Sequence, residues 1–498
     1  MSEQFPALIV VIPLFTALAL TLVGWFRPSL CQPLAALGLF GSFLSAVMTL
    51  KMVINSSVIS YRLGGWMPPY GIEYRVDSLN AMVLLMVSFV AFLVSIYARE
   101  PVRKELGDKT SNFYTLFVLL VTGLLGITIT GDAFNLYVLL EIAALTSYAL
   151  IAMGRGPAYM ATFNYVMLGT IGACFYLLGV GFLLMKTGTL NMADMGGILP
   201  ALANSRTIVI AFGFLMMGCW LKMALFPFHS WLPNAYTEAP TATSCLVAPL
   251  MTKVSVYVML RVMFTIYSAG WVFSSIDWQP IVMGLAVIAI LAGSCFALAQ
   301  KNVKRMLTYL IIAEIGYMVG GAWLGNVAGY TGAVYHIMAD GLMTVCLFMV
   351  AGSFIYKKGR VLIEDFKGAF QSMPWTMGAM VLGALSMIGV PPTCGFFSKW
   401  YLLSGAYQSG NFAFLAALLI SSLVNAILFI RLVETAFFGA TSEEEPNPHS
   451  HHDVEYADSP PSMLIPLWIS AISLLVMGIY TSEIVVNWIK PMIPGGLV

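Results

Sequence analysis

The chain has 498 residues, of which 59% are hydrophobic and only 9% are charged, and its mean hydropathy is +0.87. This composition excludes a soluble globular protein and indicates a polytopic membrane protein. With a formal net charge of +1, the chain lacks the excess of basic residues with which proteins bind nucleic acid. The seven cysteines form no Cys-x-x-Cys pair, so we expect no disulfide scaffold, no iron–sulfur or zinc site and no other cofactor.

Fourteen apolar segments are long enough to cross a bilayer, which needs about 20 such residues. We therefore predict an all-α fold of about 14 transmembrane helices in a single membrane domain that covers residues 1–498. The predicted spans are 5–26, 31–54, 78–98, 111–130, 132–153, 160–185, 207–227, 241–263, 279–299, 304–324, 330–355, 374–406, 412–436 and 462–487.

Two of these spans contain residues that interrupt a helix. The seventh runs into the sequence FPFHSWLP at residues 226–233, and the twelfth carries Pro391 and Pro392, followed by Gly395. Proline removes a backbone donor and breaks a helix. Within a membrane, broken helices are tolerated where they line a cavity or are buried in protein. We therefore expect helices 7 and 12 to be broken beside hydrated cavities.

The basic residues of the loops predict the orientation of the chain. When successive loops are assigned to alternate sides, fourteen Lys and Arg fall on one side and seven on the other. The positive-inside rule places the richer side in the cytoplasm, so both termini are expected on the non-cytoplasmic side of the cell inner membrane. Residues 55–77 alternate in polarity around two Gly and two Pro residues, which predicts a short β-hairpin on the outer face.

Four ionisable residues stand alone in long apolar segments: Glu141, Lys222, Lys253 and Lys399. A charge at the centre of a membrane costs roughly 2.5–3.5 kcal/mol on insertion scales, so we interpret them as a path for protons or small cations. Glu141 and Lys222 can form a purely structural ion pair. Alternatively, a pair that opens and closes changes the proton affinity of its lysine, which makes a loading and ejection switch.

A second polar group lies in the eleventh and twelfth spans. His336 and Asp340 are four residues apart and share a helix face with Thr344. A lone membrane histidine is commonly a packing residue, but the carboxylate one turn away favours a proton relay. Lys399 follows the break in the twelfth span and is expected to end this relay. The alternative is a lysine that snorkels to an interface.

Three further polar features have weaker functional signals. His229, just past the break in the seventh span, is a candidate proton entry, and the alternative is a capping or packing role. Glu314 is interpreted as structural because we place it nearer to a helix end. The polar stretch 441–461, with its acidic run, His449, His451 and His452, has no second cluster of ligands, and we interpret it as a solvated loop rather than a metal site.

Several motifs together resemble one known family of membrane subunits. The run LKMALFPFHSWLPNAY at residues 221–236, with EAPT at 238–241, resembles the broken seventh helix of the antiporter-like subunits. These subunits occur in respiratory complex I, in Mrp sodium/proton antiporters and in membrane-bound hydrogenases. The sequences NVKRML at 302–307 and GFFSK at 395–399 are similar to the same family elsewhere. The resemblance spans nearly the whole chain and is strongest to the D-type subunits of the Mrp antiporters.

The resemblance implies an internal symmetry and a role for each buried charge. The family has two inverted five-helix repeats, here residues 111–263 (spans 4–8) and 279–436 (spans 9–13), each with one broken helix. By matching motif, Glu141 and Lys222 would be the coupling pair. Lys253 would pass protons to the centre, and Lys399 would be the terminal exchange lysine.

One position departs from the family pattern. Many members carry a lysine in the eleventh span, where this chain has Thr344. A threonine can join a water chain but cannot hold an excess proton at neutral pH. The middle of the relay is therefore expected to depend on His336, Asp340 and water.

These observations predict a proton- or cation-translocating subunit of a multisubunit Mrp-type Na⁺/H⁺ antiporter. The alternative is a proton-pumping subunit of a complex I-like or membrane-bound hydrogenase redox complex. We expect no catalytic, cofactor-binding or metal-binding residue in the chain itself. The expected partners are other hydrophobic subunits including a paralogue, lipid, and H⁺ with Na⁺ as a second candidate ion. A stand-alone permease and a scaffold without transport are the less favoured hypotheses.

Overall fold

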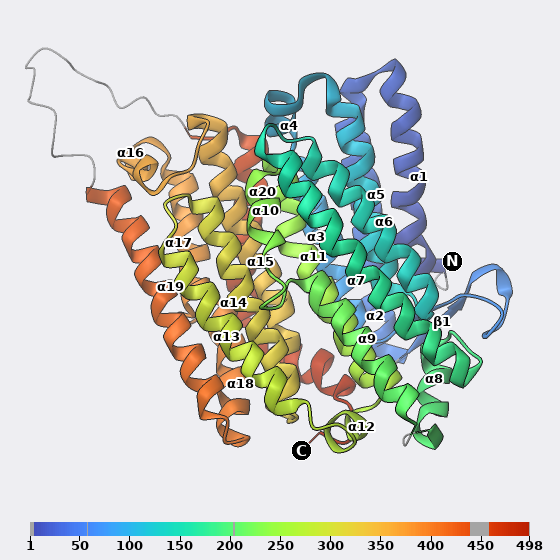
Figure 1. Ribbon diagram of the computed structural model, residues 1–498. Helices are drawn as coiled ribbons and strands as arrows, with labels where there is room; N and C mark the ends of the chain where they lie inside the picture. Colours follow the sequence, from blue (N-terminus) through green and yellow to red (C-terminus); the bar gives the residue numbers. More distant parts are fainter. Residues whose placement is uncertain (1–3, 57, 203–204, 439–457, 498) are drawn as a thin grey trace, which may run out of the picture.

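The computed structural model of the chain describes residues 4–56, 58–202, 205–438 and 458–497 (Figure 1). Long helices run alongside one another across the molecule, and the helical fold class predicted from the sequence is confirmed. The predicted solvated loop, with His449, His451 and His452, lies outside the described residues except for its last four positions.

The helices and strands follow one another in a simple order. They are α1 (Phe5–Phe26), α2 (Cys31–Ser56), β1 (Ile59–Arg62), β2 (Glu73–Val76), α3 (Ser78–Tyr97), α4 (Arg99–Leu106), α5 (Thr110–Ile129), α6 (Ala133–Ala152), α7 (Pro157–Thr187), α8 (Met192–Ile198), α9 (Arg206–Met223), α10 (Trp231–Glu238), α11 (Thr241–Arg261), α12 (Ala269–Ser274), α13 (Gln279–Leu298), α14 (Val303–Trp323), α15 (Val327–Lys358), α16 (Ala369–Ser372), α17 (Pro374–Ile388), α18 (Cys394–Gln408), α19 (Phe412–Phe438), α20 (Pro461–Ile479) and α21 (Thr481–Ile484).

The predicted count of fourteen spans is confirmed. Within the described residues, thirteen helices are long and apolar enough to cross a membrane by themselves. The remaining span is made of α17 and α18, which have 15 residues each and are too short to cross singly. Because the number of crossings is even, the start of the first span and the end of the last span lie on the same side of the membrane.

Both predicted breaks are present. Helix α9 ends at Met223 because Ala224 adopts a left-handed φ of 62°, and residues 224–230 are irregular before α10 begins. Helix α17 ends at Ile388, and Gly389, with φ of 94°, turns the chain toward α18. Gly395, which the sequence associates with the break, is already inside α18. Each of the two predicted inverted repeats, 111–263 and 279–436, contains one break, and the repeats themselves stay a prediction.

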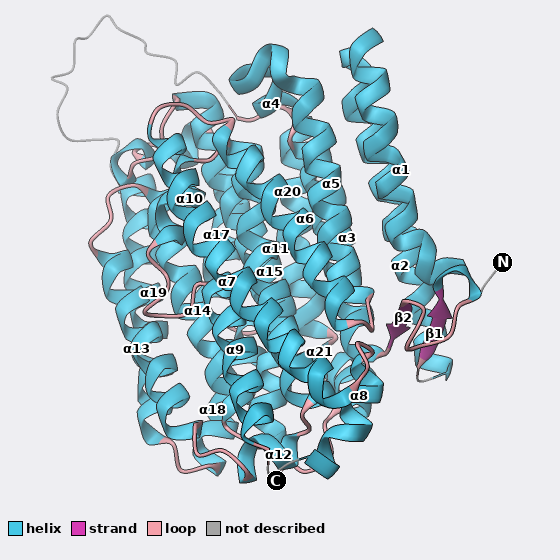
Figure 2. Ribbon diagram, turned by 45° about the vertical axis from the view of Figure 1, so that its right-hand side comes forward, coloured by secondary structure: helices cyan, strands magenta, loops and turns pink. Residues whose placement is uncertain are grey.

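The predicted hairpin over residues 55–77 is confirmed. Strands β1 and β2 pair in antiparallel register, with Ile59 opposite Val76 and Arg62 opposite Glu73. Figure 2 shows this ribbon projecting from the bundle beside α2. A backbone bridge between Tyr74 and Thr130 ties the hairpin to the end of α5.

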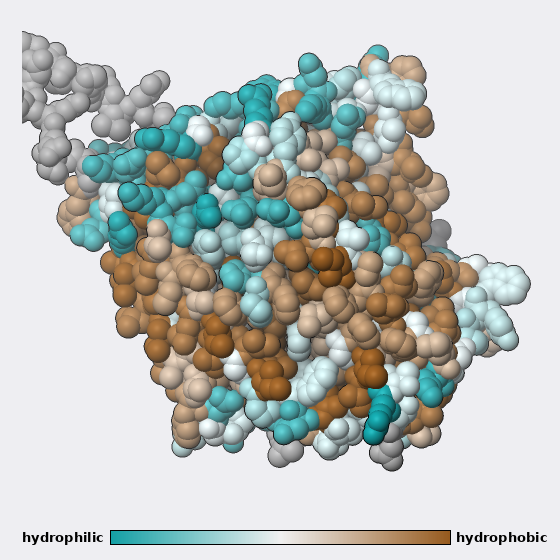
Figure 3. Space-filling model, in the orientation of Figure 1, coloured by the Kyte–Doolittle hydropathy of each residue, from teal (hydrophilic) through white to brown (hydrophobic). Residues whose placement is uncertain are grey.

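The helices differ in how deeply they are buried, and this difference positions the site. In α15 every residue of the apolar window is buried, and α11 and α14 are nearly as enclosed. Peripheral helices such as α1, α7 and α19 expose more than half of theirs. Figure 3 shows a hydrophobic belt on the surface, with hydrophilic side chains gathered along one end of the bundle. The three most enclosed helices are those that carry Lys253, Glu314, His336 and Asp340.

A bidentate ion pair locks α11 against the start of α3. Both terminal nitrogens of Arg261 lie 2.6 Å from the carboxylate oxygens of Asp77. Asp77 also caps α3, since its side chain accepts from the backbone N–H groups of Leu79 and Asn80. Burial raises the pKa of Asp77, but the charge and hydrogen bonds of Arg261 outweigh burial and lower the pKa below its ordinary value.

We predict that Asp77→Asn lowers the free energy of unfolding by about 3 kcal/mol, because it leaves the guanidinium of Arg261 without its counter-charge. In the wild type, the stabilisation from Asp77 is present above the ordinary carboxyl pKa and is lost as the pH falls through the lowered pKa. The variant should lack this acid-sensitive component. Denaturation of the purified chain in detergent across acidic pH measures both effects.

The matched control is Asp277→Asn, which changes an exposed aspartate outside this contact. It should leave the unfolding curve and its acid dependence unchanged. Equal stability of Asp77→Asn and the wild type at neutral pH would show that the ion pair contributes nothing to the fold.

Candidate functional site

Glu141 on α6 and Lys222 on α9 face each other, as expected. Lys222 Nζ lies 3.6 Å from Glu141 Oε1, and the lysine side chain is 8% exposed against 27% for the glutamate. Neither atom has a hydrogen-bond partner within the described residues. At this distance the attraction is Coulombic and lacks the directional component of a hydrogen bond. The pair is therefore held loosely enough to separate without breaking other contacts.

A small void continues from Lys222 toward α11. Its volume is about 10 Å³, which is the space that one water molecule needs. Ser255, Cys219 and Tyr176 line it together with Lys222. Ser255 is two residues after Lys253, so the void lies between the helices that carry the first two lysines.

Lys253 and Asp340 form a completely buried ion pair between α11 and α15. Lys253 Nζ lies 2.8 Å from Asp340 Oδ2, and both side chains are 0% exposed. Thr344 Oγ1 donates to Asp340 Oδ1 at 2.7 Å and lies 3.5 Å from Lys253 Nζ. Lys253 also donates to the carbonyl of Ala248. Thr344, the position that departs from the family pattern, thus contacts both members of the pair.

His336 is paired with Glu314, which lies deeper in its helix than predicted from the sequence. His336 Nε2 lies 2.5 Å from Glu314 Oε2, and both side chains are 0% exposed. Glu314 is the twelfth residue of the 21-residue helix α14, so its placement near a helix end is wrong. A lone carboxylate in the apolar span 304–324 carries the same signal as Glu141, and that signal could have identified it.

His336 and Asp340, which the sequence joins in one proton relay, contact separate partners, and the relay itself stays a prediction. His336 contacts Glu314 on α14 and Ser398 on α18, whereas Asp340 contacts Lys253 on α11. Side chains one turn apart share a face, but each here finds a closer partner on a neighbouring helix. Helix packing, rather than spacing along α15, therefore decides these pairs.

The hydroxyl of Ser398 can either donate a hydrogen bond to the His336 ring or accept one from it. His336 Nδ1 lies 2.9 Å from Ser398 Oγ, and Ser398 Oγ also lies 2.9 Å from the carbonyl of Gly395. A hydroxyl has one proton, so it can donate either to the ring or to that carbonyl. When it donates to the ring, Nδ1 accepts. When it donates to Gly395, Nδ1 must carry a proton, and the ring is charged only if Nε2, which faces Glu314, is protonated as well.

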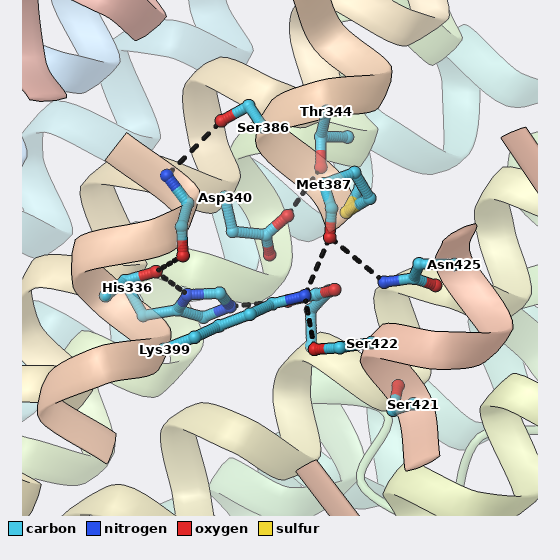
Figure 4. Close-up of polar contacts among 12 residues, drawn as sticks. His336, Asp340, Thr344, Ser386, Met387, Lys399, Ser421, Ser422 and Asn425 are labelled. Atoms are coloured by element: carbon cyan, nitrogen blue, oxygen red, sulfur yellow. Dashed lines mark hydrogen bonds and ion pairs between the residues drawn. The ribbon is translucent and has the colours of Figure 1, made fainter. Parts of the chain in front are cut away.

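Lys399 extends from α18 into the break of the twelfth span. Its Nζ donates to the carbonyls of Met387 at 2.7 Å and Ile388 at 3.3 Å, and to Ser422 Oγ at 3.2 Å (Figure 4). The side chain is buried, so the alternative of a lysine that snorkels to an interface is wrong. Its ammonium also lies over the ring of Tyr317, 5.4 Å from the centroid.

His229 lies apart from the pairs described above. It belongs to the irregular segment between α9 and α10, where its ring is half-buried and stacks on Phe226 and Phe296 with centroids 4.9 and 6.2 Å away. These contacts fit the packing alternative. Its Nδ1 is buried and has no hydrogen-bond partner in the described part of the chain, and a role in proton entry stays a prediction.

The buried charges of these pairs balance. Three lysines and three carboxylates belong to this line, so with a neutral His336 its formal charge is zero. The lysines are Lys222, Lys253 and Lys399, and the carboxylates are Glu141, Glu314 and Asp340. In a medium of low dielectric constant, one added proton changes the energy of every group in the line. Such an arrangement can hold and pass one excess proton.

A family model described as "NADH:quinone oxidoreductase/Mrp antiporter, TM" matches residues 130–425, more than half of the chain. The NADH-quinone oxidoreductase N-type subunit of Desulforudis audaxviator is 39% identical over 505 residues, covering 99% of both proteins. A D-type subunit of the Na⁺/H⁺ antiporter of Bacillus subtilis is 28% identical over 498 residues, covering 99% of this chain and 96% of that protein.

Among solved structures, the chain is similar to one in the membrane-bound sulfane sulfur reductase, described as an archaeal respiratory membrane complex. The TM-score is 0.89 at 28% identity, and the likeness covers 98% of this chain and 96% of that chain. The comparison therefore extends over all fourteen spans and includes both breaks.

We predict that removing one member of the buried pair of Lys253 and Asp340 destabilises the fold more than removing both members does. Lys253→Met and Asp340→Leu should each lower the free energy of unfolding by about 3–5 kcal/mol, because each leaves one charge buried alone. The double variant should cost less than either single one. Denaturation in detergent measures all three.

The control is Glu364→Leu, which removes one member of an exposed pair with Arg360 and should cost less than about 0.5 kcal/mol. If the cost of the double variant at Lys253 and Asp340 equals the sum of the two single costs, the two side chains do not depend on each other energetically.

Proposed function

Because the chain belongs to the NADH:quinone oxidoreductase/Mrp antiporter family, we propose that it carries protons through the membrane as one subunit of a multisubunit complex. It is an antiporter-like membrane subunit, similar along its whole length to proteins named for both kinds of complex. The observation that carries the proposal is the ion pair of Lys253 and Asp340, which is entirely buried between α11 and α15. A structural role alone would be served as well by apolar residues of similar volume.

The first step of the proposed path is the opening of the loose pair of Glu141 and Lys222. Their 3.6 Å separation lacks a hydrogen bond, so a small movement of α6 or α9 separates them. Loss of the nearby carboxylate favours release of the proton from Lys222. A water molecule in the void lined by Ser255 takes up this proton beside α11, the helix that carries Lys253.

The second step is proton transfer inside the central pair. Lys253 gives a proton from Nζ to Asp340 Oδ2, which breaks an N–H bond, forms an O–H bond and leaves two neutral groups 2.8 Å apart. Thr344 Oγ1 holds the other oxygen of Asp340 in place. A neutral pair costs less in a low-dielectric core than separated charges do. The transfer therefore needs no large change in the surrounding structure.

In the third step, the proton leaves Asp340 Oδ2, which becomes a carboxylate again, and the pair of His336 and Glu314 takes up a proton. Rotation of the Ser398 hydroxyl between the ring and the carbonyl of Gly395 selects whether His336 Nδ1 accepts or donates. The line then ends at Lys399, on which Glu314 and Asp340 both act electrostatically. Histidine suits this position because its ring has two nitrogens, each of which can accept or donate a proton.

The orientation and partners follow from the same proposal. We place both termini on the non-cytoplasmic side of the inner membrane, on the distribution of Lys and Arg among the loops. The partners are other hydrophobic subunits, including a paralogue, with lipid around the exposed apolar helices. H⁺ is the first candidate ion and Na⁺ the second.

Two assemblies are consistent with the path, and the Mrp-type Na⁺/H⁺ antiporter predicted from the motifs is one of them. A redox-driven complex is the second, and it is favoured by the 39% identical relative named as a subunit of an NADH-quinone oxidoreductase. The likeness to a chain of a respiratory membrane complex favours it as well. The relay works in the same way in either assembly.

Purification of the chain with its native partners distinguishes the two assemblies. A redox complex should bring along subunits with bound flavin or iron–sulfur clusters, which visible absorption spectra detect. An antiporter should bring only further hydrophobic subunits. Recovery of the chain alone, as an active monomer in liposomes, would contradict both assemblies.

Transport by the intact complex tests the path itself. We expect Glu141→Gln and Asp340→Asn each to slow proton movement about 100-fold, because each removes a group that holds or exchanges a proton. Lys253→Arg should fail similarly, since an arginine does not release its proton. A pH-sensitive dye inside sealed vesicles measures the rate.

The matched control is Glu434→Gln, which makes the same change at an exposed position on α19. It should leave the rate unchanged at equal expression. Wild-type rates in Asp340→Asn and Lys253→Arg would mean that the ion takes another route through the protein.

A further inference from the structure

The break in the twelfth span leaves two backbone carbonyls facing inward. The last carbonyls of a helix have no intrahelical partner. In α17, the carbonyl of Leu385 is taken by the N–H groups of Gly389 and Val390, whereas those of Met387 and Ile388 receive side chains instead. The negative end of the helix dipole of α17 points the same way. This helix end therefore attracts a cation.

A cation already occupies this position, since the ammonium of Lys399 lies there. It donates to the two carbonyls and to Ser422 Oγ, so each of its three N–H groups has an acceptor. The acceptors come from two elements, the end of α17 and the middle of α19. We call the carbonyls of Met387 and Ile388, with Ser422 and Asn425, the oxygen cage (Figure 4).

Asn425 contributes an amide that is not fully used. Its side chain is completely buried, and its Nδ2 donates to the carbonyl of Met387 at 3.2 Å. Its Oδ1 is buried and has no hydrogen-bond partner among the described residues. An unsatisfied buried acceptor is costly, about 1–3 kcal/mol, unless a donor or a cation reaches it. Rotation of the amide by half a turn places Oδ1 beside the same carbonyl, where a cation bound by both oxygens relieves the repulsion between them.

Lys399 has a second place to go. Glu314 Oε1 is buried and has no hydrogen-bond partner in the described part of the chain, and Glu314 shares a face of α14 with Tyr317, over whose ring the Lys399 ammonium lies. The lysine side chain is a flexible four-carbon stem with a compact charge at its end. Its ammonium can therefore leave the oxygen cage and pair with Glu314 without leaving the interior.

We propose that the oxygen cage is a binding site for a monovalent alkali cation, which Lys399 occupies here and which Na⁺ or K⁺ takes when the lysine turns to Glu314. The ligands are the carbonyls of Met387 and Ile388, the hydroxyl of Ser422 and the amide oxygen of Asn425. Carbonyls at the ends of broken membrane helices coordinate ions in this manner in secondary transporters. The site stands on its own geometry, and its use in transport rests on the proposed function.

The chemistry of the cage selects the class of cation. The cage contains no carboxylate, and divalent cations need charged oxygen ligands at about 2.0–2.6 Å. Here the carbonyl oxygens of Met387 and Ile388 and the hydroxyl of Ser422 lie 2.7–3.3 Å from the nitrogen of Lys399. Neutral oxygens at this spacing suit a singly charged ion of about the size of an ammonium group.

Equilibrium binding of radioactive Na⁺ and radioactive Rb⁺, a substitute for K⁺, to the full chain purified with its partners tests the site. A tethered ammonium competes at an effective concentration of millimolar or more. Lys399→Met removes this competitor while keeping most of the stem, and it should tighten cation binding by about tenfold or more. Whichever ion binds in saturable fashion identifies the cation.

Removal of the ligands should reverse this gain. Asn425→Leu or Ser422→Ala in the Lys399→Met background should abolish the tighter binding. Ser421→Ala is the matched control, because Ser421 bonds to Ser294 rather than to the cage, and it should change nothing. If Lys399→Met does not fold, weak binding to the otherwise unchanged chain at high salt should still be lost in Asn425→Leu.

The outcomes for the cage and for proton transport are independent. Glu141→Gln, which should stop proton transport, should leave cation binding intact because its position lies on α6, away from the cage. Absence of saturable binding in Lys399→Met, or binding that survives Asn425→Leu, would overturn the cation site whether or not the chain carries protons.

Discussion

The balance of buried charges is the constraint on which the rest of the structure depends. Three ammonium groups and three carboxylates lie in the interior, all buried except the partly exposed Glu141, and an uncompensated buried charge costs several kcal/mol. Each group is therefore held by a partner from another helix: Glu141 by Lys222, Asp340 by Lys253, and Glu314 by His336. Lys399 is held by backbone carbonyls. Because the line is neutral as a whole, a single added proton disturbs all of it.

The broken helix of the twelfth span is the second requirement of this arrangement. Inside a continuous helix each carbonyl already accepts a backbone N–H, whereas the carbonyls at a helix end lack this intrahelical partner. The turn at Gly389 exposes the carbonyls of Met387 and Ile388, and it also clears space for the lysine, since a Cβ at Gly389 would lie 3.2 Å from Cδ of Lys399. The irregular backbone therefore both binds the buried ammonium group and makes room for its side chain. This same feature gives Lys399 an alternative to Glu314 as a partner.

Close helix packing brings the remaining partners within reach. A Cβ at Gly332 of α15 would lie 2.8 Å from the backbone nitrogen of Leu402 on α18, so these two helices touch along their backbones. This approach is what sets Ser398 beside His336 at 2.9 Å. Small residues permit such contacts between membrane helices, where the hydrophobic effect between helices is absent. The polar pairs therefore depend on the apolar faces around them.

The sequence by itself determined the number of spans, the two breaks, the hairpin, and which lone charges lie in the membrane. Hydropathy, proline and charge are local properties, and each acts through the cost of placing one segment in lipid. The pairing of Glu141 with Lys222 was also accessible, because both were isolated charges and the family resemblance linked them.

Only the tertiary structure decided which polar groups meet in the centre. Spacing along α15 favoured contact between His336 and Asp340, but α14 supplied Glu314 to the first and α11 supplied Lys253 to the second. Thr344 appeared in the sequence as a lost lysine, whereas in the fold it binds Asp340 directly. The ligands of Lys399 include two backbone carbonyls, which cannot be identified from the residue types in the sequence. Contacts between helices depend on how whole faces pack, and periodicity within one helix cannot specify its neighbour.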